Sequence, residues 1–316
     1  MSIIIECIRT VGRGERGRKP LSFEQAYQVM DAYLNGECGD DQMAMLLMLI
    51  RVQNETQQEI AGFVKAFQSR MPNIGADIDW PCYAGKRPAA GQPWHLIAAR
   101  ILADNGKKVL LHGYDEKSSG REHAEHYLER LNIKVARNAE HAAELLALHN
   151  IAYLPLVNFA PQAEKMIAWK ARFGLRTPIN TVVRALNPGG GDIGVRGSFH
   201  PGFQQLHAEI EHEIGKSAHA VISFKGVSGE SEYNPKVSQT VWLSTQQGVE
   251  EHYWQEHFLD APILPTSCVM QTSPEDRIIM ANTVIATLTA ALFAQSREYA
   301  YAREKSLELW SDYLSN

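Results

Sequence analysis

Residues 79–121 constrain the fold of this chain more than any other stretch. A polar loop leads into an apolar helix expected over about 94–103. Asn105-Gly106 ends that helix, because glycine reaches the left-handed conformation of a helix C-terminus without a Cβ penalty. Residues 108–111 then form a short buried strand that runs into a second loop at 112–115. This order places two loops at one edge of an α/β sheet, which is where such folds bind their ligands.

The first of these loops carries two cations, Lys86 and Arg87, close to the start of the helix. Free backbone N–H groups and the helix dipole favour an anion at a helix N-terminus. We therefore interpret the loop as a candidate anion site. The alternative is a surface loop whose two cations are only solvated, and this stretch alone supports both interpretations equally.

Helical and strand patterns alternate from 80 to 159. Helices are expected over 121–130 and 139–149, and each precedes a short apolar strand, at 133–135 and 151–155. Such alternation is typical of a largely parallel sheet. Further along, the pattern predicts a helix over 203–214, a core strand over 220–224, antiparallel strands from 239 and long C-terminal helices from 276.

The N-terminal part, residues 21–67, is helical throughout in its pattern. Ser22 followed by Gln25 indicates a capping box at the start of a first helix, and Thr56 begins a third. Between them, residues 42–52 are apolar almost all round. This second helix is therefore buried, either within the domain or at a subunit interface.

Composition excludes several classes of protein. The chain has 316 residues, of which 45% are hydrophobic, enough for a sizeable core in one large or two ordinary domains. Without a run of about 18 apolar residues or a signal-like N-terminus, we expect neither a membrane span nor a secretory signal. A net charge of −5 means that local patches have to bind any polyanion. Four widely spaced cysteines indicate reduced thiols in the cytoplasm; they are Cys7, Cys38, Cys82 and Cys268.

Two local basic patches stand out. Residues 9–19 contain five basic residues, one acid and three glycines, and clustered arginines suit phosphate because the guanidinium fork matches phosphate oxygens. A helix opening at Pro161 carries further cations as far as Arg176, with no acid after Glu164. The alternative to a phosphate-binding role is a solvated connector for the N-terminal patch and a surface helix with exposed cations for the second patch. A glycine-rich turn at 188–194, with Arg196 beyond it, matches no nucleotide-binding fingerprint.

Four segments, in order along the chain, resemble anthranilate phosphoribosyltransferases. They are the helical block at 21–67 with its Glu-Thr-x-x-Glu-Ile-x-Gly signature, the stretch at 79–121, the segment RTPINTVVRALNP at 176–188 and the loop KGVSGESE at 225–232. The resemblance implies an α/β fold of the nucleoside phosphorylase class: an N-terminal helical bundle domain plus a larger, mixed, mostly parallel α/β/α domain. In relatives the helical bundle forms the dimer interface, so a homodimer is implied.

The resemblance also implies domain boundaries. The helical dimerisation domain comprises residues 1–72 and is completed by helices at about 161–187. The α/β domain comprises residues 73–160 and 188–316.

The loops that hold phosphoribosyl diphosphate in those enzymes are altered here. The Gly-Thr-Gly-Gly-Asp loop keeps Gly85 and has Lys86 in place of its acid. The Lys-His-Gly-Asn-Arg loop keeps only His112 and Gly113. Together with Glu232, these retained residues make up what we interpret as a vestigial donor site, and no catalytic residue is predicted.

The paired carboxylates that hold Mg²⁺ in those enzymes are also altered. Ser231 replaces the aspartate of the pair, Glu232 remains, and Lys225 replaces a histidine at the start of the loop. Mg²⁺ usually needs a carboxylate or two beside the phosphates. We therefore expect no cofactor and no metal centre, with Mg²⁺ required only if the chain is a transferase.

Within the family, the chain resembles the YbiB-type paralogues. Shared marks are Gly-Arg-Gly at 12–14, Tyr-x-Gly at 83–85 and Gly-Glu followed by Asn-Pro within 229–235. Proteins of that group keep the dimeric transferase fold but bind nucleic acid with little sequence preference in a basic groove. The resemblance implies that a cytoplasmic homodimer binds single- or double-stranded DNA or RNA independently of sequence, away from membranes.

The predicted phosphate contacts come from the N-terminal arm and from the cleft, and contacts of this kind give affinity without sequence readout. In the arm they are Arg13, Arg16, Arg18 and Lys19. In or near the cleft they are Lys86, Arg87, Arg176, Arg196 and Lys225.

The rival hypothesis is a phosphoribosyl- or other glycosyltransferase with a remodelled donor site. Transfer from a diphosphate donor depends on metal ions and dipoles that stabilise the leaving group, and losing the metal-binding acids removes that stabilisation. The sequence therefore favours the nucleic-acid binder. A third interpretation, a protein-interaction module, rests only on the apolar helix at 42–52, which the dimer already explains.

Overall fold

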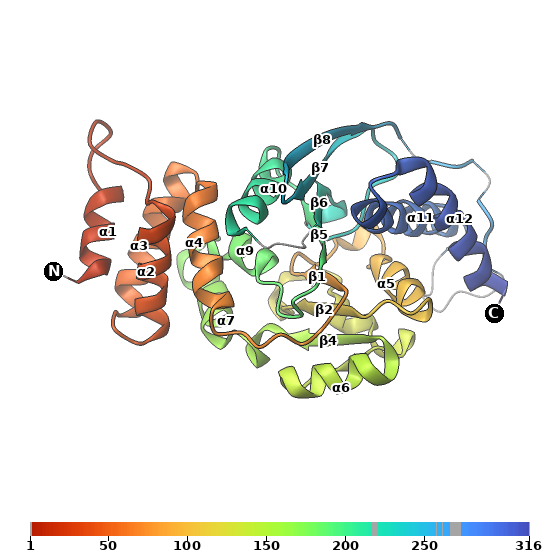
Figure 1. Cartoon of the computed structure of the whole chain (residues 1–316), viewed down its shortest axis with the longest axis horizontal. Helices are drawn as coiled ribbons and strands as arrows, with labels where there is room; N and C mark the ends of the chain where they lie inside the picture. Colours follow the sequence, from red (N-terminus) through yellow and green to blue (C-terminus); the bar gives the residue numbers. More distant parts are fainter. Residues whose placement is uncertain (1, 216–219, 257, 261, 266–272, 316) are drawn as a thin grey trace.

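The computed structural model describes residues 2–215, 220–256, 258–260, 262–265 and 273–315, which form a helical part and a larger α/β part (Figure 1). The helical part contains α1 (Ile3–Val11), α2 (Phe23–Leu34), α3 (Asp40–Gln53) and α4 (Gln57–Gln68). The chain returns later to this part with α7 (Pro161–Ala168), α8 (Lys170–Phe173) and α9 (Ile179–Val182).

Local signals start the helices of the bundle as predicted. The Ser22 hydroxyl accepts a hydrogen bond from the Gln25 N–H, and the Gln25 side chain accepts one from the Ser22 N–H; Thr56 and Glu59 make the same reciprocal pair. The apolar faces of α1 to α4 are buried in one cluster with residues of α7 and α9. The late helices therefore complete the bundle.

The α/β part is built on one eight-stranded sheet, in the order β3-β4-β2-β1-β5-β6-β7-β8. Strands β1 to β6 pair in parallel, whereas β7 and β8 add an antiparallel pair at one edge. This confirms the predicted mixed, mostly parallel sheet. The strands are β1 (Ile78–Cys82), β2 (Val109–Gly113), β3 (Lys134–Val135), β4 (Ile151–Pro155), β5 (Ile193–Ser198), β6 (Ala220–Lys225), β7 (Gln239–Thr245) and β8 (Gly248–Trp254).

Helices cover both faces of the sheet (Figure 1). Alternate strand residues face opposite sides, so Leu111 and Tyr153 belong to one core cluster while Leu110 and Leu154 belong to another. The first face packs on α5 (His95–Asp104) and α11 (Pro274–Ser296), with α12 (Tyr299–Ser315) outside; the second packs on α6 (Ala139–His149) and α10 (Phe203–Ile214). Short 3-10 helices occupy Pro88–Ala90, Lys117–Ser119, Ala124–Tyr127, Glu129–Leu131, Leu156–Asn158, Val183–Ala185 and Val227–Gly229.

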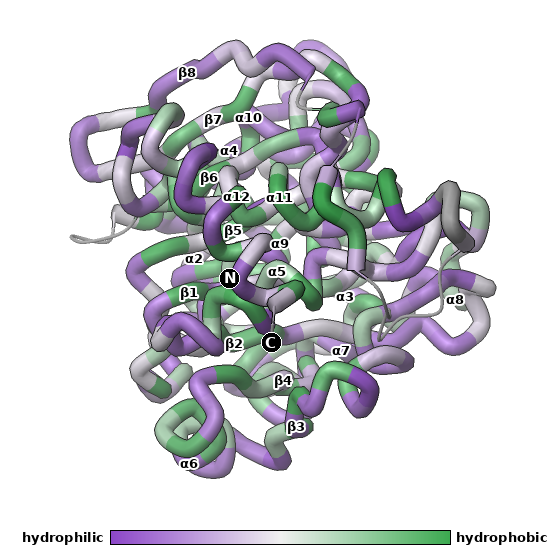
Figure 2. Tube along the Cα trace, turned by 90° about the vertical axis from the view of Figure 1, so that its right-hand side faces the viewer, coloured by the Kyte–Doolittle hydropathy of each residue, from purple (hydrophilic) through white to green (hydrophobic). Residues whose placement is uncertain are grey.

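Helix α11 is long and apolar enough to cross a membrane by length and composition, but 78% of its most hydrophobic window is buried inside the protein. Figure 2 shows α11 as largely hydrophobic, in contrast to the edge strand β8, whose residues are mainly hydrophilic. Helix α11 lies between the sheet and α12 and is therefore a core helix.

One expectation about local structure was wrong, and one helix was not predicted. The predicted helix over 121–130 is replaced by two 3-10 turns, because an antiparallel bridge between Lys86 and Glu122 holds the start of the segment extended. The N-terminus was not predicted to be helical, yet α1 forms and packs on α3. The bundle supplies the apolar surface that stabilises so short a helix.

Candidate functional site

The carboxyl ends of β1, β2 and β4 meet at one edge of the sheet, with Cys82 beside Gly113 and Gly113 beside Pro155. On the other side of β1, β5 ends at Ser198 beside Lys225 of β6. The loops that follow these strands therefore gather at this edge, as the sequence predicted. Two layers of charged residues occupy the region: a buried layer of ion pairs and a cavity lined by arginines.

Lys86 belongs to the buried layer. Its Nζ lies 2.5 Å from Glu232 Oε1 and donates to the Gln92 carbonyl at 2.6 Å, and both charged side chains are fully buried. The ammonium also lies 4.2 Å from the centroid of the Trp94 ring. The prediction that Lys86 contacts phosphate from the cleft is therefore corrected, because its charge is already paired inside the protein.

The residues that the resemblance relates to a metal site do not fit a divalent cation. Glu232 Oε2 accepts a hydrogen bond from the His95 N–H at 2.9 Å and lies 3.3 Å from His95 Nδ1. Ser231 Oγ donates to the Pro81 carbonyl at 3.0 Å and accepts from the Gly197 N–H at 3.2 Å. With Nζ of Lys86 on the remaining oxygen, the one carboxylate here is saturated by the chain itself.

The pKa of Glu232 reflects this pairing. Burial alone raises the pKa of the carboxyl, but the charges of Lys86 and His95 and their hydrogen bonds outweigh burial and hold it below its ordinary value. Glu232 is therefore an internal counter-ion of Lys86 rather than a ligand awaiting a metal.

Arg196 also belongs to the buried layer. Its Nε lies 2.8 Å from Glu211 Oε1 and its Nη1 lies 2.7 Å from Asp79 Oδ2, with the guanidinium fully buried. The prediction that Arg196 contacts phosphate is likewise corrected. A cation held between two carboxylates in the core stabilises the junction of β1, β5 and α10 instead.

The residues predicted as a vestigial donor site are built into the same packed edge. His112 Nδ1 lies 2.8 Å from the Tyr83 hydroxyl and its Nε2 lies 3.1 Å from Asp79 Oδ1. Gly113 has the Cys82 carbonyl 2.2 Å from where a Cβ would stand. Gly85 has a φ of +62°, and a Cβ built on it would lie 2.8 Å from the nearest atoms of the His123 ring. These positions serve packing in this chain.

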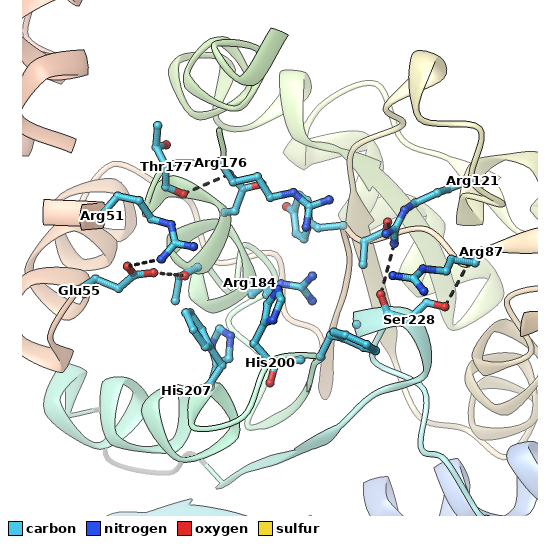
Figure 3. Close-up of a pocket in the computed structure, with 18 residues that line it drawn as sticks. Arg51, Glu55, Arg87, Arg121, Arg176, Thr177, Arg184, His200, His207 and Ser228 are labelled. Atoms are coloured by element: carbon cyan, nitrogen blue, oxygen red, sulfur yellow. Dashed lines mark hydrogen bonds and ion pairs between the residues drawn. The ribbon is translucent and has the colours of Figure 1, made fainter. Parts of the chain in front are cut away.

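Above the buried layer lies a cavity lined by five arginines: Arg51, Arg87, Arg121, Arg176 and Arg184 (Figure 3). They come from the end of α3, from the loops after β1 and β2, and from the segment around α9. Among the described residues that line the cavity, the one acid is Glu55, whose Oε2 lies 3.8 Å from Arg51 Nη1. The cavity is strongly cationic in a chain of net charge −5.

Two of the arginines are held in place by backbone oxygens. Arg121 Nη1 donates to the Ala84 and Gly85 carbonyls at 3.1 and 3.0 Å. Arg184 Nη1 donates to the Gly197 carbonyl at 2.9 Å. These bonds fix the guanidinium groups without neutralising their charge.

The electrostatics of the cavity follow from this crowding. Burial lowers the pKa of Arg184, and Arg176 lowers it further against the opposing effect of Glu230. Burial likewise lowers the pKa of Arg121, with added repulsion from Arg176 and Arg87. A bound anion would favour the charged form of these arginines and so offset the repulsion between them.

The structure brings together two of the nine predicted phosphate contacts, Arg87 and Arg176, in this cavity. Lys225 is exposed at the end of β6 but does not line it. The arm residues are exposed on the loop between α1 and α2, at the outer end of the helical bundle in Figure 1; they are Arg13, Arg16, Arg18 and Lys19.

Three of the cavity arginines were not predicted from the sequence: Arg51, Arg121 and Arg184. Arg184 carried a usable signal, since it is the one charge in the mostly apolar run INTVVRAL. Arg51 follows the apolar part of α3 in the same way. Arg121 gave no such signal, because only the chain's return to the loop after β1 brings it to the cavity.

The cysteines agree with the sequence analysis as far as they are described. Cys7, Cys38 and Cys82 are free thiols. Burial raises the pKa of the Cys7 thiol to about 12. Cys268 lies outside the described residues.

Comparisons with known proteins support the resemblance to this family. Residues 5–71 match the helical bundle domain of the glycosyl transferase family. The chain is 33% identical over 207 residues to the anthranilate phosphoribosyltransferase of Geobacillus stearothermophilus, covering 64% of this chain and 59% of that enzyme. It is 25% identical over 276 residues to the uncharacterized protein YbiB of Escherichia coli (strain K12), covering 85% and 84%.

A solved structure shows the same fold over the whole chain. The crystal structure of anthranilate phosphoribosyltransferase from Thermus thermophilus matches with a TM-score of 0.72 at 22% identity, covering 100% of this chain and 99% of that one. A likeness at this identity shows the fold alone. Together with the aligned sequences and the helical bundle, it supports an anthranilate phosphoribosyltransferase-like family for this chain.

Proposed function

We propose that this protein binds nucleic acid without sequence preference, on a phosphoribosyltransferase scaffold. The observation that carries the proposal is the convergence of five arginine side chains on one cavity whose described lining contains a single acid, Glu55. Arginine is suited to phosphate because its planar fork offers two parallel hydrogen bonds to phosphate oxygens. A ligand with many phosphates also has partners in the exposed cations of the arm.

The buried layer argues against the rival transferase function. Enzymatic transfer from a diphosphate donor draws on metal ions and aligned dipoles at the leaving group. Here Lys86 and His95 occupy both oxygens of Glu232, and Ser231 is hydrogen-bonded to the backbone on both sides. Nucleic-acid binding requires no metal and no catalytic residue, and the cavity arginines are groups suited to phosphate.

The binder is proposed to be a cytoplasmic homodimer. On α3, Met45 is 56% exposed and Val52 is 67% exposed, although most other apolar residues of that helix are buried. Exposed apolar side chains on the helical bundle suit a contact with a second copy of the chain. A dimer presents two arginine cavities and two arms to one polyanion, which adds avidity.

A titration tests the proposal directly. A labelled single-stranded oligonucleotide is titrated with the protein by fluorescence anisotropy at several salt concentrations. We expect log K to fall linearly with log salt by about 0.7 for each phosphate contacted, and competition by unrelated sequences to be equal. No binding at low salt would exclude this function, and saturable, Mg²⁺-dependent binding of phosphoribosyl diphosphate in calorimetry would favour the transferase.

A further inference from the structure

The floor of the arginine cavity contains polar groups that the protein itself leaves without partners. Ser198 Oγ and His207 Nδ1 are buried and make no hydrogen bond to any described residue, and the same is true of Thr177 Oγ1. Buried polar atoms of this kind cost free energy unless a ligand or water satisfies them. A surface that merely attracts phosphates has no need of such groups.

Arg184 belongs to this floor and points into the middle of the cavity (Figure 3). It forms no ion pair with any described residue, and its bond to the Gly197 carbonyl uses one of its five N–H donors. Arg184 is half-buried, and Glu230 favours its charge without forming a salt bridge with it. A cation shielded from water without a salt-bridge partner is costly. An anion that enters the cavity compensates this charge.

His207 limits the kind of anion that fits. Burial, with added repulsion from Arg184 and Arg196, lowers the pKa of His207 to about 3. The ring is therefore neutral at physiological pH and offers one N–H donor rather than a second charge. The floor combines one fixed cation with neutral donors, which matches a compact group with several acceptor oxygens.

An aromatic side chain at the same cavity adds a second requirement. Phe199 is 45% exposed and lines the cavity, and the Arg87 guanidinium lies 5.7 Å from the centroid of its ring. In proteins that bind single-stranded nucleic acid, exposed aromatic rings beside cations serve as stacking platforms for unpaired bases. Phosphate donors inside the cavity and a ring at its wall suit one nucleotide with its terminal phosphate.

We propose that the arginine cavity binds the terminal phosphomonoester of a nucleotide, with the phosphate at Arg184, Ser198 and His207 and the base near Phe199. The proposal rests on the proposed nucleic-acid function and specifies it. A phosphomonoester carries close to two negative charges and three free oxygens, whereas an internal phosphodiester has a single charge and two ester links that must leave the cavity. The group belongs either to the end of a strand or to a free nucleotide.

The test compares oligonucleotides of about 12 nucleotides, a length within the range that single-strand sites cover. They have identical sequence and a fluorophore at the 3′ end, and their 5′ end is either a hydroxyl or a phosphate. A second pair carries the label at the 5′ end and the phosphate or hydroxyl at the 3′ end. We expect one phosphorylated end to bind about tenfold more tightly than the matching hydroxyl, as charge-assisted hydrogen bonds predict.

Variants locate the preference in the cavity. Arg184→Met and, as a smaller change, Ser198→Ala are expected to reduce the ratio of the two affinities towards one. Arg130→Met, an exposed arginine outside the cavity, is expected to leave it unchanged. Because the readout is a ratio within one protein, a partial loss of folded protein does not imitate the result.

The outcomes separate this inference from the proposed function. Equal affinity for phosphate and hydroxyl ends at both termini overturns the inference and leaves nucleic-acid binding standing. A preference that survives both cavity variants also overturns it. Displacement of the phosphorylated oligonucleotide by a nucleoside monophosphate, but not by the nucleoside, supports the same cavity with a free nucleotide as its ligand. No binding of any oligonucleotide overturns the proposed function itself.

Discussion

The ammonium of Lys86 lies 2.5 Å from the carboxylate of Glu232, and both side chains are fully buried. The pair joins the loop after β1 to the segment after β6, across 146 residues of sequence. A divalent cation has to displace the ammonium before it reaches this carboxylate. In this chain, therefore, a covalently attached cation is paired with the carboxylate that the resemblance relates to a metal site.

Removing the ammonium is expected to destabilise the protein strongly. Lys86→Met leaves Glu232 as an uncompensated buried charge, which costs about 3–5 kcal/mol. Urea unfolding measures the loss, and the double variant Lys86→Met/Glu232→Gln is expected to recover most of it. A loss below about 1 kcal/mol, the usual worth of an exposed ion pair, would contradict the buried pairing.

The stability conferred by Glu232 is expected to depend on pH. Because the folded pKa of Glu232 lies below its ordinary 4.5, the folded state binds fewer protons than the unfolded state in this range. The contribution is fully present above pH 4.5 and is lost as the pH falls through the folded pKa. Urea unfolding of the wild type and of Glu232→Gln should therefore converge in acid. A constant difference between the two proteins would refute this assignment.

Replacing Arg196 is expected to lower the free energy of unfolding rather than to weaken oligonucleotide binding specifically. Arg196→Met leaves the carboxylates of Asp79 and Glu211 unpaired in the core, with a cost of about 3–5 kcal/mol in the free energy of unfolding. The control is Arg176→Met at an exposed position, where stability should change by less than about 0.5 kcal/mol. Arg176→Met should instead weaken oligonucleotide binding in the anisotropy assay. If Arg196→Met folds normally and loses only binding, the buried position of Arg196 is wrong.

The basic arm between α1 and α2 is expected to contribute phosphate contacts, and salt is expected to weaken these contacts. Replacing Arg13, Arg16 and Arg18 together by Gln should reduce the slope of log K against log salt by about 2, since each contact on a single strand contributes about 0.7. Stability should stay unchanged, because all three side chains are exposed. Arg130→Gln is the control for loss of one exposed arginine. An unchanged slope in the triple variant would remove the arm from the interface.

The proposed dimer is expected to depend on the exposed apolar residues of α3. Met45→Lys combined with Val52→Lys places two charges on that surface and should shift the protein to a monomer in analytical ultracentrifugation. Leu148→Lys on α6, at a residue that is 75% exposed, is the control and should leave the mass unchanged. If the double variant remains a dimer, the dimer interface does not include this surface of α3.

Several elements were predictable from the sequence to the residue. Helix α6, strand β4 and helix α10 begin and end where the sequence pattern placed them. Their limits are set by neighbouring residues, such as Asn138, whose side chain caps α6. The helix expected over 121–130 failed because a contact with Lys86, distant in sequence, competes with its local preference.

The sequence by itself predicted the resemblance to the family, the helical bundle, the mostly parallel sheet and the edge at which loops gather. It also showed that acids had been replaced by cations at that edge. Only the tertiary structure decided which cations face a cavity and which are internal. Lys86 and Arg87 are adjacent in sequence, yet Lys86 is paired with Glu232 in the core while Arg87 lines the arginine cavity. The physical reason is that a charge is neutralised by whichever distant carboxylate the packing brings beside it, and that neighbour is set by the whole fold.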